Sequence, residues 1–371
     1  MPSLSSSLNL GDLCILRLSA LGDVCNLVPA VRALQKQQPG IKITWVIGRA
    51  EYNLLAGLEG VDFFIYDKKS GLAGMRALRK EIMDKRAGKP FDVLLHMQAA
   101  LRASVLSRFI PAKRRIGFDA ARAKDNQNWF VNEQINANPN VRVGQGFMDF
   151  VHYLGVAKTE PEWSIPVPEA DQAVAKQLVA GLERYLVISP CSSFRKRNWR
   201  NWEDFVGWAE VIDYAQQAYG LTTVLVGGQT ELEKNATAQI IKHSQSKILD
   251  LMGKTNLKAL LAVIDGAELV IAPDSGPIHM AAARGKPALG LYATSNPART
   301  GPWLDDYVVN RYPEAVAKYL KQPLETVAWG QRVRSPNAMG LITSQDVIEK
   351  LDLIAADLKL KKLSPKIPTR I

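Results

Sequence analysis

Apolar residues in the first half of the chain form two alternating kinds of stretch. Short apolar runs with the length of buried strands lie at residues 13–17, 43–47, 63–66 and 93–96. After the first run, apolar residues recur at helical spacing, at Val24, Leu27, Val28, Val31 and Leu34. A basic segment, 74–86, is a second helix candidate. Because strands alternate with helices, we predict a parallel sheet with helices on both faces.

The alternation lapses at residues 158–168, KTEPEWSIPVP, which we interpret as a linker, and then resumes. The later strand candidates are residues 185–189, 223–226, 269–272 and 288–291, and the helix candidates are residues 202–219, 231–243, 278–284 and 344–359. A chain of 371 residues is too long for one ordinary core. We therefore predict an α/β protein with two Rossmann-like domains whose parallel sheets face a cleft. The predicted parts are residues 1–165, residues 166–340, and residues 341–371 with a final helix and a basic tail.

The first strand candidate leads into RLSALGDVCNLVPAV, which places a carboxylate, Asp23, near the start of a helix. Ligands of open α/β sheets bind beyond the carboxyl ends of the strands, so Asp23 is well positioned to meet a substrate. An aspartate at a helix start also commonly accepts backbone N–H groups, and we hold this capping role as an equal alternative. The two roles compete, because a capping carboxylate is a weaker base. The segment lacks GxGxxG, so it does not match a dinucleotide fingerprint.

A second strand-to-helix junction, ELVIAPDSGPIHMAAA at residues 268–283, predicts an anion site. Pro277 suits the start of a helix, and Gly276 allows close approach of the backbone. The amides of Ser275 and Gly276 would then lie at the positive end of the helix dipole, where phosphate binds readily. The alternative is that Asp274 and Ser275 are ordinary caps. For His279 alone we favour a buried, hydrogen-bonded side chain.

Two further loops follow strands of the second half. In SPCSSFRKRNWRNWEDF (residues 189–205) a strand ends in small hydroxyl residues and is followed by cations that can neutralise a diphosphate. A basic surface loop above packed tryptophans is the alternative. In LVGGQTELEKN, Glu231 is a candidate for holding ribose hydroxyls or, equally, an acidic residue favoured by the helix dipole.

The formal net charge of +11 suggests a polyanionic partner such as nucleic acid, a phosphorylated glycolipid or an anionic membrane surface. The sequence lacks zinc-finger spacing and RNP-type aromatic patterns, which argues against nucleic acid. Three scattered cysteines and four distant histidines argue against disulfides and a metal site. Without a signal-like start or a long apolar run, we expect a cytoplasmic protein.

Together, LSALGDV and Asp274-Ser275-Gly276-Pro277-Ile278-His279 resemble the ADP-heptose:lipopolysaccharide heptosyltransferases of glycosyltransferase family 9, whose motif is D-[S/T]-G-x-x-H. The resemblance covers residues 13–291 and implies a GT-B fold, with an acceptor domain first, a nucleotide-sugar domain second and a final helix that packs back on the first domain. It implies an inverting, metal-independent transfer of heptose, without a cofactor, from ADP-heptose to the anionic inner core (Kdo and heptose) of lipopolysaccharide. It also implies peripheral association with the inner face of the cytoplasmic membrane.

By this resemblance Asp23 is the general base, and the Ser275 and Gly276 amides bind the diphosphate. The candidate donor-binding residues are Ser192, Lys196, Arg197, Arg200, Glu231, Thr255, Asp274, Ser275, Gly276, Pro277 and His279. The candidate acceptor-binding residues are Ser19, Gly22, Gln98, Arg102, Arg122 and Lys124. Arg200 aligns with a family lysine, and Lys196 and Arg197 are alternatives for its role. Other GT-B transferases, epimerases and a non-catalytic glycan-binding relative are the competing functions.

Overall fold

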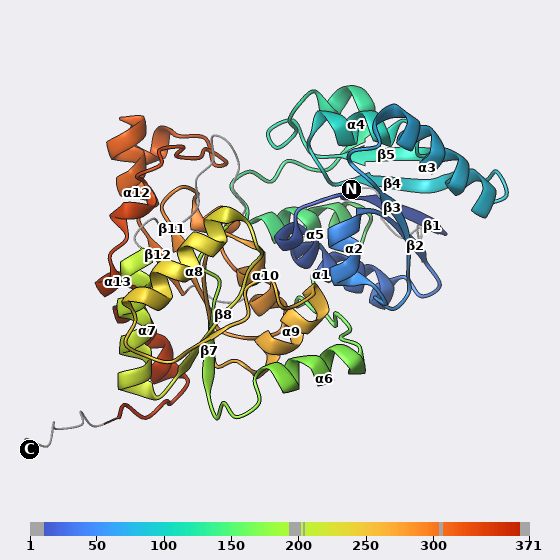
Figure 1. The fold of residues 1–371 in the computed structure, drawn as a ribbon. Helices are drawn as coiled ribbons and strands as arrows, with labels where there is room; N and C mark the ends of the chain where they lie inside the picture. The colour runs from blue at the N-terminus through green and yellow to red at the C-terminus, as the bar shows by residue number, and fades with distance from the viewer. Residues whose placement is uncertain (1–10, 193–201, 203–204, 304–306, 364–371) are drawn as a thin grey trace, which may run out of the picture. The chain divides into compact units, whose positions relative to one another are not determined.

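The computed structural model describes residues 11–192, 202, 205–303 and 307–363. The chain divides into two units, Met1–Pro166 and Val167–Ile371, and the division falls one residue beyond the expected 165/166 boundary. Within the described ranges, the strands form one six-stranded parallel sheet in each unit. The α/β alternation predicted from the apolar runs is confirmed, and Figure 1 labels its elements.

The first unit contains the elements β1 (Asp12–Leu16), α1 (Leu21–Gln37), β2 (Lys42–Gly48), α2 (Arg49–Leu55), β3 (Val61–Tyr66), α3 (Gly71–Lys85), β4 (Phe91–His96), α4 (Leu101–Ser107), β5 (Ala112–Gly117), η1 (Gln127–Phe130), β6 (Glu133–Gln134) and α5 (Val143–Tyr153). Its strand order is β3-β2-β1-β4-β5-β6. Helices α3 and α4 cover one face of this sheet, and α1 and α5 lie side by side on the other (Figure 1). The apolar stripe predicted for α1 is fully buried, which explains why the helix forms there.

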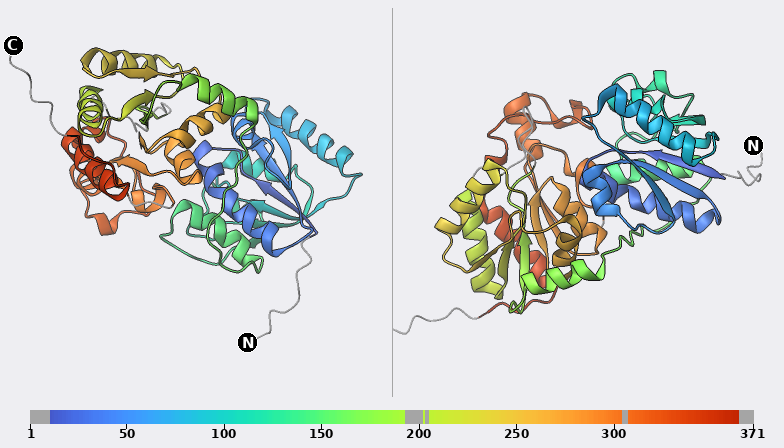
Figure 2. Two further views of the ribbon diagram at one scale, coloured as in Figure 1. Left: turned by 90° about the horizontal axis from the view of Figure 1, so that it is seen from below. Right: turned by 45° about the vertical axis from the view of Figure 1, so that its right-hand side comes forward.

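The second unit contains α6 (Glu169–Leu178), β7 (Tyr185–Ile188), α7 (Phe205–Tyr219), β8 (Thr222–Leu225), α8 (Glu231–His243), β9 (Ile248–Asp250), α9 (Leu257–Gly266), β10 (Val270–Pro273), α10 (Gly276–Ala283), β11 (Ala288–Tyr292), α11 (Pro297–Thr300), β12 (Val308–Asn310), α12 (Tyr312–Ala315), the short turns η2 (Val316–Leu320), η3 (Leu324–Thr326) and η4 (Met339–Leu341), and α13 (Ser344–Asp357). Its strand order is β12-β11-β10-β7-β8-β9, so when its strands are counted from β7 it repeats the order of the first sheet. Helix α6 lies beside α9 (Figures 1 and 2).

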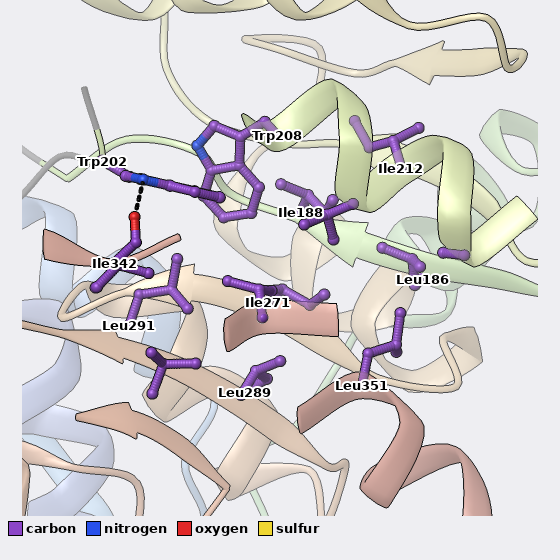
Figure 3. Packing of buried hydrophobic residues seen from close by; sticks show 14 of the residues in the cluster. Leu186, Ile188, Trp202, Trp208, Ile212, Ile271, Leu289, Leu291, Ile342 and Leu351 are labelled. Carbon is purple, nitrogen blue, oxygen red and sulfur yellow. Dashed lines mark hydrogen bonds between the residues drawn. The ribbon is translucent and has the colours of Figure 1, made fainter. Parts of the chain in front are cut away.

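Two buried tryptophans organise the core of the second unit. Trp202 and Trp208 meet edge to face with their ring centroids 4.9 Å apart. The Trp202 indole N–H donates to the carbonyl of Ile342 at 3.1 Å, and apolar side chains of β7, β10 and β11 pack beneath (Figure 3). Trp202 therefore lies ahead of α7 as a buried anchor and does not begin that helix. An edge-to-face aromatic pair is a favourable way to fill a core, although the buried indole N–H of Trp208 has no hydrogen-bond partner among the described residues.

The apolar face of the final helix, α13, with Val347, Leu351 and Ile354, is buried in the same cluster as the two tryptophans. The helix contacts α7 and β12 and belongs to the second unit. The expectation that it packs back on the first domain stays a prediction. The sequence pattern predicted which face of α13 is apolar, but it did not identify the surface of the second unit that covers that face.

Candidate functional site

In the first sheet, β1 and β4 are neighbours, and the helices that follow them lie on opposite faces. Such a reversal leaves a crevice at the carboxyl ends of the two strands, where α/β proteins commonly bind ligands. The second sheet has the equivalent pair, β7 and β10. The candidate residues named from the sequence mostly follow these four strands.

Asp23 is the third residue of α1, directly beyond β1. Its carboxylate accepts the backbone N–H of Ala20 at 3.1 Å and forms an ion pair with Arg17. The side chain nevertheless stays 29% exposed. Asp23 therefore helps to cap the helix, as one of the two interpretations held, while its side chain stays partly exposed. Its meeting with a substrate stays a prediction.

Arg17 connects the ends of the two central strands. Its guanidinium donates to the Met97 carbonyl at 2.6 Å, contacts Asp23 and lies 5.2 Å from the centre of the Phe147 ring. Gln98 makes a parallel connection, because its side-chain oxygen accepts the Leu18 N–H at 2.7 Å. These bonds hold the loops after β1 and β4 in one fixed arrangement. Sequence reasoning missed Arg17, although it lies in the same motif six residues before Asp23.

His96 ends β4 and is fully buried. Its Nε2 lies 3.0 Å from the hydroxyl of Ser104, while Nδ1 has no hydrogen-bond partner among the described residues. Burial, reinforced by the charge of Arg17, lowers the pKa of His96 to about 3. The imidazole is therefore neutral near pH 7 and adds no second positive charge beneath Arg17.

The basic residues predicted to meet an acceptor differ in availability. Arg122 pairs with both Asp119 and Asp149 and is only 16% exposed, so its charge is already used to brace the fold. Arg102 is exposed on α4 and donates one hydrogen bond, to the Lys68 carbonyl at 3.0 Å. The structure thus favours Arg102 over Arg122 as a contact for an anionic ligand.

The other acceptor candidates lie around the same edge of the sheet. Ser19 is half-buried in the turn before α1, and Gly22 is buried as the second residue of that helix. Lys124 is exposed in the loop between β5 and η1. Of the three, Gly22 is adjacent to Asp23 in the chain, and Ser19 lies in the turn just before it.

In the second unit, α10 begins directly beyond β10 with Ser275 as its N-cap. Residues 275–277 are half-buried, so the first turn of the helix is partly exposed. The Ser275 hydroxyl is buried and has no hydrogen-bond partner among the residues described. Unpaired N–H groups at a helix start, together with an unused hydroxyl, suit an anion that would complete their hydrogen bonds.

Asp274 supports this helix start from behind. Its buried carboxylate accepts hydrogen bonds from Ser295 at 2.7 Å and Thr300 at 3.3 Å, and Arg332 lies 3.6 Å away. His279 is buried within α10, as favoured from the sequence. These contacts hold the residue directly before Ser275 in a buried network of protein side chains. Arg332 could not be predicted from the sequence, because it lies 58 residues beyond Asp274 in the chain.

The remaining donor candidates are less enclosed. Glu231 begins α8 with its side chain 90% exposed, and its hydrogen bond with Lys234 lowers the pKa of its carboxyl. Glu233, two residues on, shapes the glycine-rich loop by accepting the N–H groups of Gly228 at 2.7 Å and Thr230 at 2.9 Å. Thr255 is half-buried just before α9.

Ser192 is buried beyond β7. Lys196, Arg197 and Arg200 lie outside the described residues. In the part of the chain that is described, no three His, Cys, Asp or Glu side chains lie together as a metal site requires, and no helix is long and apolar enough to cross a membrane.

The sequence matches the model of glycosyltransferase family 9 (heptosyltransferase) over residues 75–326. It is 37% identical to the lipopolysaccharide core heptosyltransferase OpsX of Haemophilus influenzae over 341 residues, which cover 92% of this chain and 96% of that protein. It is 25% identical to lipopolysaccharide heptosyltransferase 3 of Escherichia coli K12 over 308 residues, covering 77% and 84% of the two chains.

Solved structures share the fold. A glycosyltransferase of family 9 from Veillonella parvula matches with a TM-score of 0.78 at 22% identity, covering 95% of this chain and 99% of that one. The E. coli heptosyltransferase WaaC with ADP matches with a TM-score of 0.70 at 18% identity, covering 92% and 99%. This likeness confirms the predicted GT-B class, with two Rossmann-like domains.

Proposed function

Because this chain belongs to glycosyltransferase family 9 (heptosyltransferase), we propose that it transfers a heptose from ADP-heptose to a hydroxyl of the inner core of lipopolysaccharide. The proposal is carried by one observation about the carboxyl ends of the strand pairs β1 and β4 and β7 and β10. The first presents an accessible carboxylate, Asp23, and the second presents an accessible helix start at Ser275. A base and an anion site are the two parts that sugar transfer from a nucleotide diphosphate needs.

In the proposed reaction Asp23 removes the proton from the attacking acceptor hydroxyl. The hydroxyl oxygen forms a bond to the anomeric carbon while the bond from that carbon to the diphosphate oxygen breaks. Attack comes from the face opposite ADP, so the configuration inverts. Arg17 holds the carboxylate in one orientation, since it is itself fixed by the Met97 carbonyl and the Phe147 ring.

The leaving ADP carries the negative charge that develops. In the proposal this charge is stabilised by the backbone N–H groups at Ser275 and Gly276, by the α10 dipole, and by the cations of the loop with Lys196, Arg197 and Arg200. Such donors and cations do the work that a metal ion does in other transferases, so we propose a metal-independent reaction without a cofactor. Glu231 and Thr255 are proposed to contact the ribose and the base.

The two units then have separate tasks. The first holds the anionic acceptor through Ser19, Gly22, Gln98, Arg102 and Lys124, and the second holds the donor. Arg122 is not proposed to contact the acceptor, because its guanidinium already pairs with Asp119 and Asp149 and stabilises the fold.

The purified protein is expected to release ADP from ADP-heptose only when a lipid-free inner-core acceptor is present. The rate is expected to be the same in about 5 mM EDTA, which is enough to chelate trace metal. UDP-, GDP- and dTDP-sugars serve as competing donors, and NMR of the product reports the anomeric configuration. Transfer from a different nucleotide sugar would point to another GT-B transferase. Binding of donor and acceptor without turnover would identify a non-catalytic relative.

We also propose that the protein works in the cytoplasm, on the inner membrane surface where a glycolipid acceptor lies. The net charge of +11 and exposed cations such as Arg102 favour an anionic surface. Vesicles with anionic lipids are therefore expected to retain the protein at about 50 mM salt and to release most of it at about 300 mM. Neutral phosphatidylcholine vesicles are the control, and retention that ignores ionic strength would contradict the idea.

A further inference from the structure

A pocket of about 350 Å³ opens in the first unit between the end of β5 and β6, within residues 120–134. One lining residue, Gln127, joins the pocket to the ends of β4 and β5. The Gln127 side chain donates to the His96 carbonyl at 2.9 Å and accepts the Phe118 N–H at 3.1 Å. Because His96 ends β4, the pocket lies at the same carboxyl edge of the sheet as Asp23, toward β5.

The loop around the pocket is held at both sides. On one side Asp119 pairs with Arg122, which also reaches Asp149. On the other side the Asp125 carboxylate accepts the backbone N–H of Leu101 at 3.2 Å. The pocket wall is therefore preorganised, which lowers the entropy lost when a ligand binds.

The side chains that line this wall have unused hydrogen-bonding capacity. Asn126, Asn128 and Gln134 line the pocket, and their carboxamides have no hydrogen-bond partner among the residues described. Each carboxamide offers an acceptor oxygen and a donor NH₂ group. The lining also contains one lysine, Lys124, and one aspartate, Asp125, so it does not present a net charge to an ion.

The segment that lines the pocket also carries an exposed aromatic side chain. Trp129 is 73% exposed, the most exposed of the large apolar side chains within the described ranges, and it follows Asn128 directly. An exposed aromatic face packs well against the C–H face of a pyranose, while neighbouring carboxamides match the paired donors and acceptors of its hydroxyls. A phosphate would be better served by paired cations, and a nucleobase by an enclosed apolar slot.

We propose that the pocket of Asn126, Asn128 and Gln134, with the Trp129 ring, is a subsite for a neutral sugar unit of the acceptor, distinct from the sugar that carries the reacting hydroxyl. This inference rests on the proposed function for its assignment to the acceptor. The subsite would select among acceptors by the positions of their hydroxyl groups. This selectivity does not depend on the carboxylates or phosphates of the acceptor.

The test measures binding and turnover with a lipid-free inner-core oligosaccharide in the full-length protein. Trp129→Ala and the double variant Asn126→Ala/Asn128→Ala are expected to raise the acceptor KM about tenfold, with kcat changed less than about twofold. Trp129→Phe keeps an aromatic face and is expected to retain most of the affinity. Leu72→Ala, which removes a similarly exposed apolar side chain on α3, is the matched control and should leave KM unchanged.

Saturation-transfer NMR with the same oligosaccharide separates this inference from the proposed function. If the wild-type protein transfers no sugar but binds the oligosaccharide, and Trp129→Ala loses that binding, the subsite stands and the transferase proposal fails. If the wild type transfers heptose while both variants keep its acceptor KM and its NMR contacts, the subsite is overturned.

Discussion

Asparagine in place of Asp23 is expected to lower kcat by about 10²- to 10⁴-fold, the range that loss of a general base produces. Asparagine has nearly the same shape, and its side-chain oxygen can still accept the Ala20 N–H that Asp23 accepts at 3.1 Å. It cannot take up a proton, and it gives up the ion pair with Arg17. Donor affinity should stay within about twofold by calorimetry with ADP, because the proposed anion site lies in the other unit.

Asp12 supplies a matched control for this variant. It is a carboxylate of the same unit, paired with Arg86 at 2.6 Å, and its side chain is 27% exposed where that of Asp23 is 29% exposed. Asp12→Asn removes a comparable ion pair without touching the loops after β1 and β4, so its kcat should remain near that of the wild type. If Asp23→Asn kept more than about half of the wild-type rate, Asp23 would not be the base.

Alanine in place of Asp274 is expected to lower the free energy of unfolding of the second unit by about 3 kcal/mol, the lower end of the range for breaking a buried ion pair. The lower end applies because the pair with Arg332 is 3.6 Å long and the arginine side chain is 21% exposed. The change also leaves the hydroxyls of Ser295 and Thr300 without their shared acceptor. ADP affinity should fall as well, since Ser275 loses its support.

Urea unfolding and hydrogen exchange of the β10 amides measure this loss. Asp265→Ala is the comparison, because Asp265 pairs with Arg284 in the same unit but is 33% exposed, and such a pair contributes at most about 1 kcal/mol. Asp274→Asn retains an acceptor oxygen and should cost about half as much as Asp274→Ala. Equal losses in the Asp265 and Asp274 alanine variants would show that Asp274 has no special supporting role.

Most of the strands that could be predicted are buried on both faces, where uninterrupted apolar runs occur. The strand β3 is only partly buried, and it was predicted because its last four residues, FFIY, are all apolar. All eight predicted strands lie within two residues of observed ones. The strand β5, with the sequence AKRRIG, was missed because its charged side chains lie half-buried or exposed near the edge of the sheet. The strands β6, β9 and β12 have only two or three residues each, too few for a periodic pattern.

For the site, local chemistry was readable and distant pairing was not. The sequence placed Asp23 and Ser275 at strand-to-helix junctions, since both junctions are set by residues within one motif. It did not separate Arg102 from Arg122, because the partner that removes Arg122 from the surface, Asp149, lies 27 residues away. From the sequence alone, a charged side chain cannot be recognised as already paired when its counterion lies far along the chain.

Among the residues that the structure describes, every strand of both sheets pairs with a parallel neighbour, and no two adjacent strands are joined by a tight hairpin. Each unit must therefore assemble its central strands from segments far apart in the chain, which makes the unit cooperative and slow to nucleate. Cutting the chain inside either sheet separates strands from the partners of their backbone hydrogen bonds. A cut between Pro166 and Val167 divides neither sheet. Fragment studies of this protein belong at that junction.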